Sequence, residues 1–424
     1  MKETRDTGSL GHVLGYKCVL CGAEYGLGDV DYVCPRHGNE GILDVRYDYR
    51  AIKSRISPAQ LANDREQSIW RYKPMLPVRP DAPVPPLRVG WTPLYPAQRL
   101  AEPLGLKHLW IKDESPNPTA SFKDRASAIA VVKAQEVGAK IITTASTGNA
   151  AAALAGLAAS VGMQAVIFVP ESAPAAKIAQ HLVYGARVLL IDGTYDDAFE
   201  LALEAAYEFG WYNRNTAYNP FMSEGKKTAA YEICEQLAWN PPDRIFVPVG
   251  DGCIIGGIHK GLRDLLALGW IDRMPRLMGI QSEGCSPLVE AFERDMSGEE
   301  MARVQADTIA DSISAGLPRD RVKALTAVRQ TDGAFLAVSD QEILNAIPAI
   351  ARRTGVFCEP AAAAAYAGLV KALELGAVST AERIVLLLTG SGLKDIPSAM
   401  KTVKPAPVIP ADLDAVREIL GSIK

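Results

Sequence analysis

The sequence predicts an α/β protein in which parallel-rich, doubly wound sheets form two lobes. Short apolar runs recur from residue 108 onward, and Ala-rich stretches of helical length separate most of them. Alternation of strand and helix is typical of a parallel sheet covered by helices on both faces. The runs are almost continuously apolar, as expected for strands buried on both sides. They are HLWIK (108–112), KIITTAS (140–146), QAVIFVP (164–170), RVLLID (187–192), RIFVPVG (244–250), RLMGIQ (276–281) and RIVLLLTG (383–390).

The chain divides by composition into three parts. With 424 residues it is too long for one compact core. Residues 1–50 contain a cluster of Cys and His, and residues 51–106 form a helical and Pro-rich strap with eight prolines between positions 74 and 96. Residues 107–424 are expected to form the two α/β lobes, with a small lobe of roughly residues 140–215 inserted in the large lobe.

Composition excludes several classes of partner. The net charge is −4 and the sequence has no block of basic residues, so no positively charged segment for binding nucleic acid is expected. No apolar run approaches the ~18–20 residues that cross a bilayer, so no membrane partner is expected. The N-terminal residues lack the apolar core of a secretory signal. The seven cysteines are partly clustered and partly scattered, a usage that favours the reducing cytoplasm over a disulfide framework.

A lysine follows the first apolar run, in the segment KDESPNPTASFKDRAS (112–127). Asn117, Thr119 and Ser121 favour turns and helix caps, so Lys123 is predicted in the first turn of a helix. The positive end of the helix dipole disfavours a further positive charge there. A desolvated lysine at this place has a lowered pKa, which suits Schiff-base chemistry. The alternative is a solvated lysine at an ordinary helix start.

Two further loops have sequences that are suited to binding an anion. Ser146, Thr147 and Gly148 form a small polar turn before Asn149 and an Ala-rich helix, whose first N–H groups suit a carboxylate. The Gly-rich segment VPVGDGCIIGG (247–257) joins a strand to a helix, a shape that binds phosphate through main-chain donors. Taken alone, the turn before Asn149 is a common strand–turn–helix connection. The Gly-rich segment alone is as consistent with tight packing as with phosphate binding.

Thr389 stands at the carboxyl end of the last apolar run, where ordinary turn chemistry is the alternative. Ligands of parallel sheets bind at the carboxyl ends of the strands. The loops after these runs are therefore expected to meet in one site.

The order of these segments and their amino-acid sequences resemble those of the threonine synthase family of fold type II pyridoxal-phosphate enzymes. KDESPNPTASFKDR is similar to the family's lysine motif, STGNAAA to its asparagine turn and VGDGCIIGG to its phosphate loop. The segments NPFMSEGKKTAAYEI, VFCEPAAAAA and TGSGLKD also match in order. The resemblance extends from about residue 16 to about residue 400.

The resemblance implies pyridoxal 5′-phosphate as the cofactor and a role for each loop. Lys123 carries the cofactor, Asn149 donates to the pyridoxal 3′ oxygen, and Thr389 faces the pyridine nitrogen. Ser146, Thr147 and Gly148 hold the carboxylate of a small amino-acid substrate. The cofactor phosphate is cradled by Gly250, Asp251, Gly252, Cys253 and Ile254. The family resemblance also implies a homodimer.

The resemblance carries an expectation about catalysis as well. A neutral hydroxyl at Thr389 leaves the pyridine nitrogen largely unprotonated, so the ring is a weaker electron sink. Prompt loss of a β or γ leaving group is then favoured, with Lys123 as the base that takes the α-proton.

Four positions depart from the family pattern around the phosphate of O-phosphohomoserine. Met222 stands where the family has arginine, Ala217 where serine is common, Ala150 where threonine is frequent, and Ile254 where the phosphate loop has asparagine. Lys226, at the usual glutamine position, is one possible compensation. The departures predict a substrate without that phosphate.

The N-terminal cluster Cys18-x2-Cys21-x12-Cys34-x2-His37 has the spacing of two zinc knuckles. Three thiolates and one imidazole complete a tetrahedral zinc site, which is structural because no position is left for substrate. The alternative is a degenerate ribbon with free thiols. Glu359, in the CEPAAAAA segment, is expected at a helix start near the cofactor or facing solvent.

Three functional hypotheses follow. The first is a lyase or synthase that performs β- or γ-elimination or replacement on an amino acid and lacks the phosphohomoserine phosphate site. The second is threonine synthase itself, with a rearranged phosphate site. The third is a non-catalytic zinc-ribbon binding module on an inactive enzyme fold.

Overall fold

The computed structural model describes residues 10–173 and 175–421. Within that part, the strands form three sheets. They are β1 (Val13–Cys18), β2 (Glu24–Tyr25), β3 (Leu43–Tyr47), β4 (Leu94–Pro96), β5 (His108–Asp113), β6 (Ile141–Ala145), β7 (Gln164–Pro170), β8 (Arg187–Ile191), β9 (Tyr212–Asn213), β10 (Arg244–Pro248), β11 (Arg276–Ser282), β12 (Ala334–Val338) and β13 (Arg383–Leu388). The short 3-10 helices are η1 (Gly38–Glu40), η2 (Ile69–Met75), η3 (Glu102–Leu104), η4 (Asp311–Ile313) and η5 (Gly392–Lys394).

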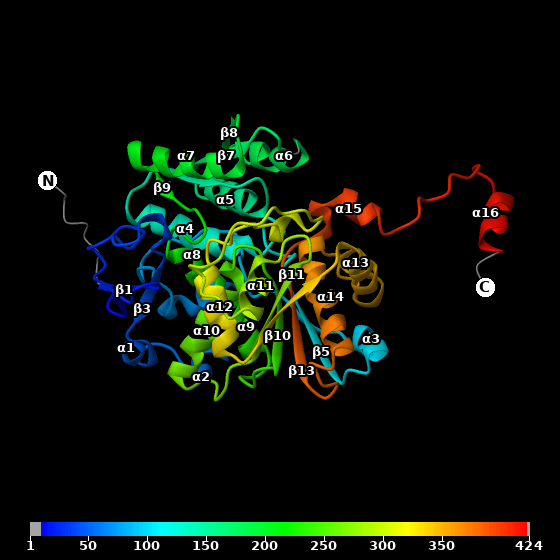
Figure 1. Ribbon diagram of the computed structural model, residues 1–424, viewed down its shortest axis with the longest axis horizontal. Coiled ribbons are helices and arrows are strands. Elements are labelled where there is room, and N and C mark those ends of the chain that lie inside the picture. The colour runs from blue at the N-terminus through cyan, green and yellow to red at the C-terminus, as the bar shows by residue number, and fades with distance from the viewer. Residues whose placement is uncertain (1–9, 174, 422–424) are drawn as a thin grey trace.

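The α-helices cover the faces of the sheets (Figure 1). They are α1 (Tyr49–Lys53), α2 (Pro58–Leu61), α3 (Gln98–Ala101), α4 (Lys123–Glu136), α5 (Asn149–Ser160), α6 (Ala175–Val183), α7 (Tyr195–Glu208), α8 (Phe221–Lys226), α9 (Thr228–Gln236), α10 (Cys253–Leu268), α11 (Pro287–Glu293), α12 (Arg321–Gln330), α13 (Asp340–Thr354), α14 (Pro360–Glu374), α15 (Ile396–Met400) and α16 (Leu413–Leu420).

The large sheet has the order β12-β11-β10-β13-β5-β4 and is parallel except for the edge pair β4 and β5. Alternate side chains of its central strands enter different cores. Ile245 and Val247 of β10 join the core that contains α4, α10 and α12, whereas Phe246 joins the core that contains α13 and α14. The sheet is therefore buried on both faces, as the continuous apolar runs predict.

The small sheet has the order β8-β7-β6-β9 and is wholly parallel. Helix α5 lies against one face, where Leu154 packs in the same core as Ile167, and α7 lies against the other, where Phe199 packs with Phe168. The sheet and its helices lie above the large sheet in Figure 1. Parallel sheets with helices on both faces in two lobes confirm the predicted fold class.

Local signals in the sequence set where several helices begin and end. A capping box joins Thr194 and Asp197 at the start of α7, and another joins Ser339 and Glu342 at the start of α13. Helix α10 ends at Gly269, which adopts a left-handed φ of 69°. These caps define the starts of α7 and α13 and the end of α10.

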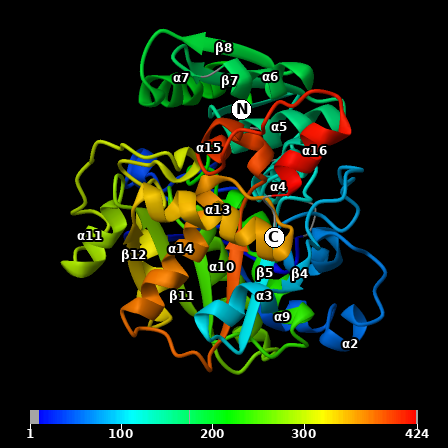
Figure 2. The ribbon, with the colours of Figure 1, turned by 90° about the vertical axis from the view of Figure 1, so that its right-hand side faces the viewer.

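The N-terminal segment forms the third sheet, of order β2-β1-β3 with antiparallel pairing. It lies beside α8 and α10 on the flank of the large lobe (Figure 1). At the other end of the chain, α16 stands away from the body on an extended arm (Figure 1), which points toward the viewer in Figure 2, and none of its residues is buried. Along the described residues, no helix combines the length and apolar composition that a bilayer crossing needs.

Three strands of the large and small sheets were absent from the predicted runs. β4 and β12 are edge strands, and β9 has two residues at the edge of the small sheet. Only two of the five residues of β12 are buried, so its sequence lacks a continuous apolar signal.

Candidate active site

A cavity opens at the carboxyl ends of β5, β10 and β13, where the loops of the large lobe meet the start of α5. The chain therefore brings together loops that are up to about 270 residues apart in the sequence. The cavity is lined by Phe122, Lys123, Asn149, Pro248, Val249, Gly250, Asp251, Gly252, Cys253, Ile254, Ser312, Ile313, Glu359 and Thr389.

Lys123 is the first residue of α4 and is half-buried at the cavity. The backbone N–H of Phe122 donates to the carbonyl of Thr389 at 2.8 Å, so the lysine turn is fixed to the end of β13. Burial lowers the pKa of the Lys123 ammonium group, and the positive charge of Arg214 lowers it further. A larger neutral fraction at neutral pH suits this amine to attack on a carbonyl.

The loop before α10 forms a cradle that only glycine allows. A Cβ at Gly252 would lie 2.8 Å from the Cβ of Ala324, and Gly252 has a φ of 86°. A Cβ at Gly250 would lie 2.8 Å from the Cα of Ile313. The first N–H groups of this 16-residue helix have no partners within the helix. The cradle therefore fits the phosphate of pyridoxal phosphate through main-chain donors.

Asn149 enters the cavity from the small lobe, as the first residue of α5. Its Nδ2 donates to both carboxylate oxygens of Glu359, at 3.0 and 3.1 Å. Glu359 is the N-cap residue of α14 and is 4% exposed, which excludes the solvent-facing alternative. Burial raises the pKa of the Glu359 carboxyl group, and the bond from Asn149 opposes this.

Thr389 is buried in the cavity wall at the end of β13, beside Gly390. A Cβ at Gly390 would lie 2.5 Å from Oε1 of Glu359, so this glycine leaves room for the carboxylate. The hydroxyl of Thr389 and the carboxylate of Glu359 therefore share one side of the cavity.

The turn of Ser146, Thr147 and Gly148 directly precedes Asn149 at the start of α5. The backbone N–H of Ser146 donates to the carbonyl of Phe168 at 3.2 Å, and that of Gly148 donates to Oγ of Ser146 at 3.3 Å. Among the described residues, the turn is not part of the cavity lining, although its neighbour Asn149 is.

The four positions that depart from the family pattern have different surroundings. Met222 is buried in the main core, and Ile254 lines the cavity. Ala217 packs with Ile42 and Cys253 and has a left-handed φ of 64°. Ala150 follows Asn149 in α5 and is half-buried.

Two buried cations stand near the cavity, and only one of them was considered from the sequence. Burial lowers the pKa of Lys226 to about 8, and the nearby positive charges of Lys123 and Arg214 add to this effect. Burial also lowers the pKa of Arg214 to about 10. Arg214 follows β9, in the segment NRNTAYNPF, and no motif marked it in the sequence.

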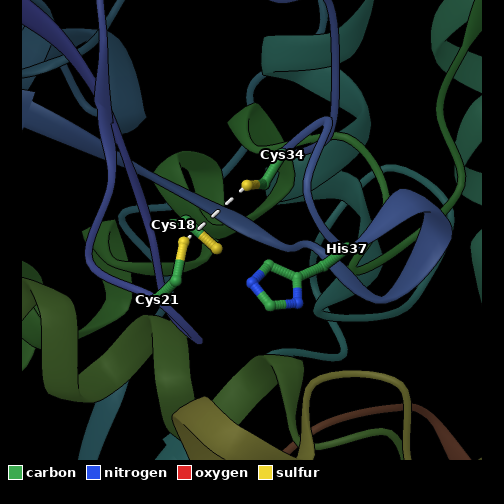
Figure 3. A group of neighbouring side chains, drawn as sticks. All are labelled: Cys18, Cys21, Cys34 and His37. Atoms are coloured by element: carbon green, nitrogen blue, oxygen red, sulfur yellow. Dashed lines mark hydrogen bonds between the residues drawn. The ribbon is translucent and has the colours of Figure 1, made fainter.

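The N-terminal cysteines and histidine converge, as Figure 3 shows. The four potential ligand atoms of Cys18, Cys21, Cys34 and His37 all lie within 4.8 Å of one another. The hydroxyl of Tyr25 lies 3.0 Å from Sγ of Cys34, in the position of an outer hydrogen-bond partner. Three sulfurs and one imidazole are a donor set that fits tetrahedral zinc.

A lysine at a helix start, opposite a glycine cradle at the carboxyl ends of a parallel sheet, defines a pyridoxal-phosphate-dependent enzyme of fold type II. Comparisons agree with this class. The profile of the family described as pyridoxal-phosphate dependent enzyme matches residues 86–390. The processed form of threonine deaminase isoform 2 from Solanum lycopersicum has a similar fold, with a TM-score of 0.63 and 24% identity over 75% of this chain and 88% of that chain.

Curated relatives narrow the assignment. The chain is 40% identical to the threonine synthase of Methanocaldococcus jannaschii, over 96% of this chain and 99% of the relative. It is 41% identical to the threonine synthase of Methanosarcina acetivorans over the same shares. The chain belongs to the threonine synthase family of pyridoxal-phosphate-dependent enzymes.

Proposed function

We propose that the chain uses pyridoxal phosphate to catalyse β- or γ-elimination or replacement on a small amino acid. The observation that carries this proposal is the convergence of Lys123, Asn149, Thr389 and the Gly250–Ile254 cradle in one cavity. When bound, the cofactor supplies an electron sink for charge that develops at the substrate α-carbon.

Each side chain has a role that follows from its place. Nζ of Lys123 would hold the cofactor, and its amine would take the α-proton of the substrate, since burial holds the pKa of Lys123 below the ordinary value. The amide of Asn149, whose Nδ2 donates to the carboxylate of Glu359, would orient the cofactor ring. The uncharged hydroxyl of Thr389 would serve as the partner of the ring nitrogen.

The substrate carboxylate is assigned to the turn of Ser146, Thr147 and Gly148. The support for this assignment is its place before the 12-residue helix α5, where free N–H groups favour an anion. The arginine expected for a phosphohomoserine phosphate is missing at Met222, which supports a substrate other than phosphohomoserine.

Threonine synthase itself is the second candidate, and a specific observation favours it. Two relatives named threonine synthase are about 40% identical over nearly the whole chain. In that case the phosphate of phosphohomoserine is held by residues other than the expected arginine.

The proposal includes one structural zinc ion at Cys18, Cys21, Cys34 and His37, supported by their convergence and by the donor set. It also includes a homodimer in the cytoplasm, the assembly and compartment that the family resemblance and the cysteine usage predict. Sedimentation of the purified protein measures the assembly.

The decisive experiment joins spectroscopy with turnover. Purified protein with added cofactor should be yellow, and Lys123→Ala should lose the visible band. Turnover is then compared for phosphohomoserine, serine, threonine, phosphoserine and diaminopropionate by release of phosphate, ammonia or ketoacid. An unchanged visible spectrum in Lys123→Ala contradicts the cofactor assignment. Threonine formed from phosphohomoserine with a kcat/KM at or above ~10⁴ M⁻¹s⁻¹ selects threonine synthase.

A further inference from the structure

Lys394 is a half-buried lysine in the TGSGLKD segment after β13, and no step of the proposed function uses it. Its Nζ donates to Oε1 of Gln180 in α6 at 3.0 Å, so its bonded partner is a neutral amide of the small lobe. Burial lowers the pKa of Lys394, while the carboxylates of Glu359 and Asp124 raise it. The charge of Lys394 therefore acts on two buried carboxylates of the large lobe.

The backbone holds the segment that carries Lys394 against the segment that carries Glu359. The N–H of Glu359 donates to the carbonyl of Gly390 at 3.1 Å, and the N–H of Gly392 donates to the carbonyl of Phe357 at 2.9 Å. These two bonds fix the start of η5 relative to the N-cap of α14. The place of Lys394, the last residue of η5, is therefore set by the fold.

The protonation state of Glu359 decides which way the amide of Asn149 points. An ionised carboxylate can only accept hydrogen bonds, so the amide turns Nδ2 toward it, at 3.0 and 3.1 Å from the two oxygens. Nδ2 also lies 3.3 Å from Oγ of Ser312, a residue of the cavity lining, so its second N–H faces the cavity. A protonated Glu359 can instead donate to Oδ1, and the turned amide then presents an acceptor to the cavity.

Groups from four elements act on the carboxyl group of Glu359. Burial raises its pKa, and the bond from Asn149, the charge of Lys394 and the charge of Lys123 lower it, in that order of size. Asp311 in η4 raises it again. Because Lys123 is committed to the cofactor in the proposed function, Lys394 is the cation left to keep Glu359 ionised.

Two other titratable groups face Lys394, and neither takes its place. Asp124 already accepts from the N–H and the hydroxyl of Thr119, at 2.8 and 2.6 Å. Burial raises the pKa of Asp124 to about 6. On the side of the small lobe, burial lowers the pKa of His181 to about 4, so its ring is uncharged at neutral pH. His181 therefore adds no second cation to this contact between the lobes.

We propose that Lys394 is a positioning residue for the cofactor: its charge keeps Glu359 ionised, and the ionised carboxylate holds the amide of Asn149 with an N–H toward the cavity. This inference rests on the proposed function, because an oxygen of the cofactor is the acceptor for that N–H. Since Gln180 of α6 holds the ammonium group, the same contact joins the two lobes. Lys394 thus acts on the cofactor through two other side chains and touches neither cofactor nor substrate.

The pH dependence of the visible cofactor band of the holoenzyme tests this role. Lys394→Gln should move the acid limb of the titration upward by about one pH unit, because Glu359 then binds its proton about 10-fold more tightly. The dissociation constant of pyridoxal phosphate should rise about 10-fold at the acid end and less than about 2-fold at the alkaline end, where Glu359 is ionised in either protein. Lys394→Arg keeps the charge and should keep most of the wild-type profile. Lys401→Gln, on an exposed lysine just after α15, should match the wild type.

The Glu359→Gln variant distinguishes this role from a purely structural one, and it tests the inference even if Lys394→Gln folds poorly. It removes the titrating group, so the acid limb should be absent, and adding Lys394→Gln should change the profile no further. A Lys394→Gln profile equal to that of the wild type overturns the inference, and so does an acid limb that Glu359→Gln leaves in place. A shift that persists in the double variant belongs to Asp124 and also overturns it. Failure of the proposed function is separate, because it appears as a visible band that Lys123→Ala does not remove.

Discussion

Arg125, two residues after Lys123, is the centre of a buried ion network. Its guanidinium contacts Glu114 at 2.7 Å and Glu232 at 2.5 Å, and Glu232 also contacts Lys112 at 2.7 Å. All four side chains are 0% exposed. Two cations and two anions balance here, and the network fixes the first turn of α4 to β5 and α9.

Glu232→Gln should destabilise the protein by about 3–5 kcal/mol, because it leaves Lys112 and Arg125 buried with one anion between them. Chemical unfolding followed by fluorescence measures the change. Glu374→Gln at the end of α14 is the matched control and should change the free energy of unfolding by less than about 0.5 kcal/mol. Equal unfolding midpoints for wild type and Glu232→Gln would show that the network contributes little.

The same carboxylate gives stability a defined dependence on pH. Although burial opposes it, the charges of Arg125 and Lys112 lower the pKa of Glu232 from 4.5 to about 2. A lowered pKa means that the stabilisation is present above pH 4.5 and is lost as the pH falls toward 2, by about 3 kcal/mol in all. The free energy of unfolding of the wild type should fall over this range more steeply than that of Glu232→Gln. Parallel curves for the two proteins would contradict the assignment.

At the level of elements, α8 is held between α4 and α10 at glycines. A Cβ at Gly225 of α8 would lie 2.0 Å from the carbonyl oxygen of Arg125 in α4. A Cβ at Gly261 of α10 would lie 2.4 Å from the carbonyl oxygen of Lys227, just after α8. Lys226, the last residue of α8, therefore lies between α4 and α10.

Gly261→Ala should therefore push α8 from α10 and destabilise the protein by about 1–3 kcal/mol. Thermal unfolding measures the change. Gly28→Ala is the control, since a Cβ there has no atom within 4 Å. A Gly261→Ala protein as stable as the control would mean that α8 and α10 adjust without cost.

Some residues of the candidate site could be predicted from the sequence, and others could not. Lys123, Gly250 and Thr389 could be placed in one site because each follows an apolar run, and parallel strands end at the same edge of a sheet. Arg214 could not, because its position depends on a hydrogen bond to Ser127, which is 87 residues away in the chain. The bond between Asn149 and Glu359 joins residues 210 apart in the chain, and no local pattern marks it.

At the level of the whole molecule, the N-terminal segment supports the back of the cofactor cradle. Ile42 packs against Cys253, the first residue of α10. Asp44 in β3 lies 3.0 Å from Nζ of Lys260 in α10 and 3.7 Å from Nζ of Lys323 in α12. The charges of both lysines hold the pKa of the Asp44 carboxyl group well below its ordinary value, against the effect of burial. The cluster of cysteines and histidine at the end of β1 and the cradle are therefore joined by one short strand.

The metal content of the protein should depend on an intact cysteine cluster. About one zinc ion per chain is expected by elemental analysis, and Cys18→Ser should lower both zinc content and solubility, because one of four ligands is lost. The protein that still folds should keep its visible cofactor band. Native protein of normal stability without metal would contradict the zinc site.

The Asp44→Asn variant tests whether the N-terminal segment supports the cradle independently of metal binding. The variant keeps all four potential zinc ligands but loses the charge that holds Lys260 and Lys323, so zinc content should stay the same while α10 and α12 are less firmly fixed. The dissociation constant of pyridoxal phosphate should then rise by about 10-fold, the effect of about 1.4 kcal/mol. Glu24→Gln breaks the exposed pair with Arg46 in the same segment and should leave cofactor affinity unchanged. If Asp44→Asn binds the cofactor as tightly as Glu24→Gln, the N-terminal segment stabilises the fold without shaping the cradle.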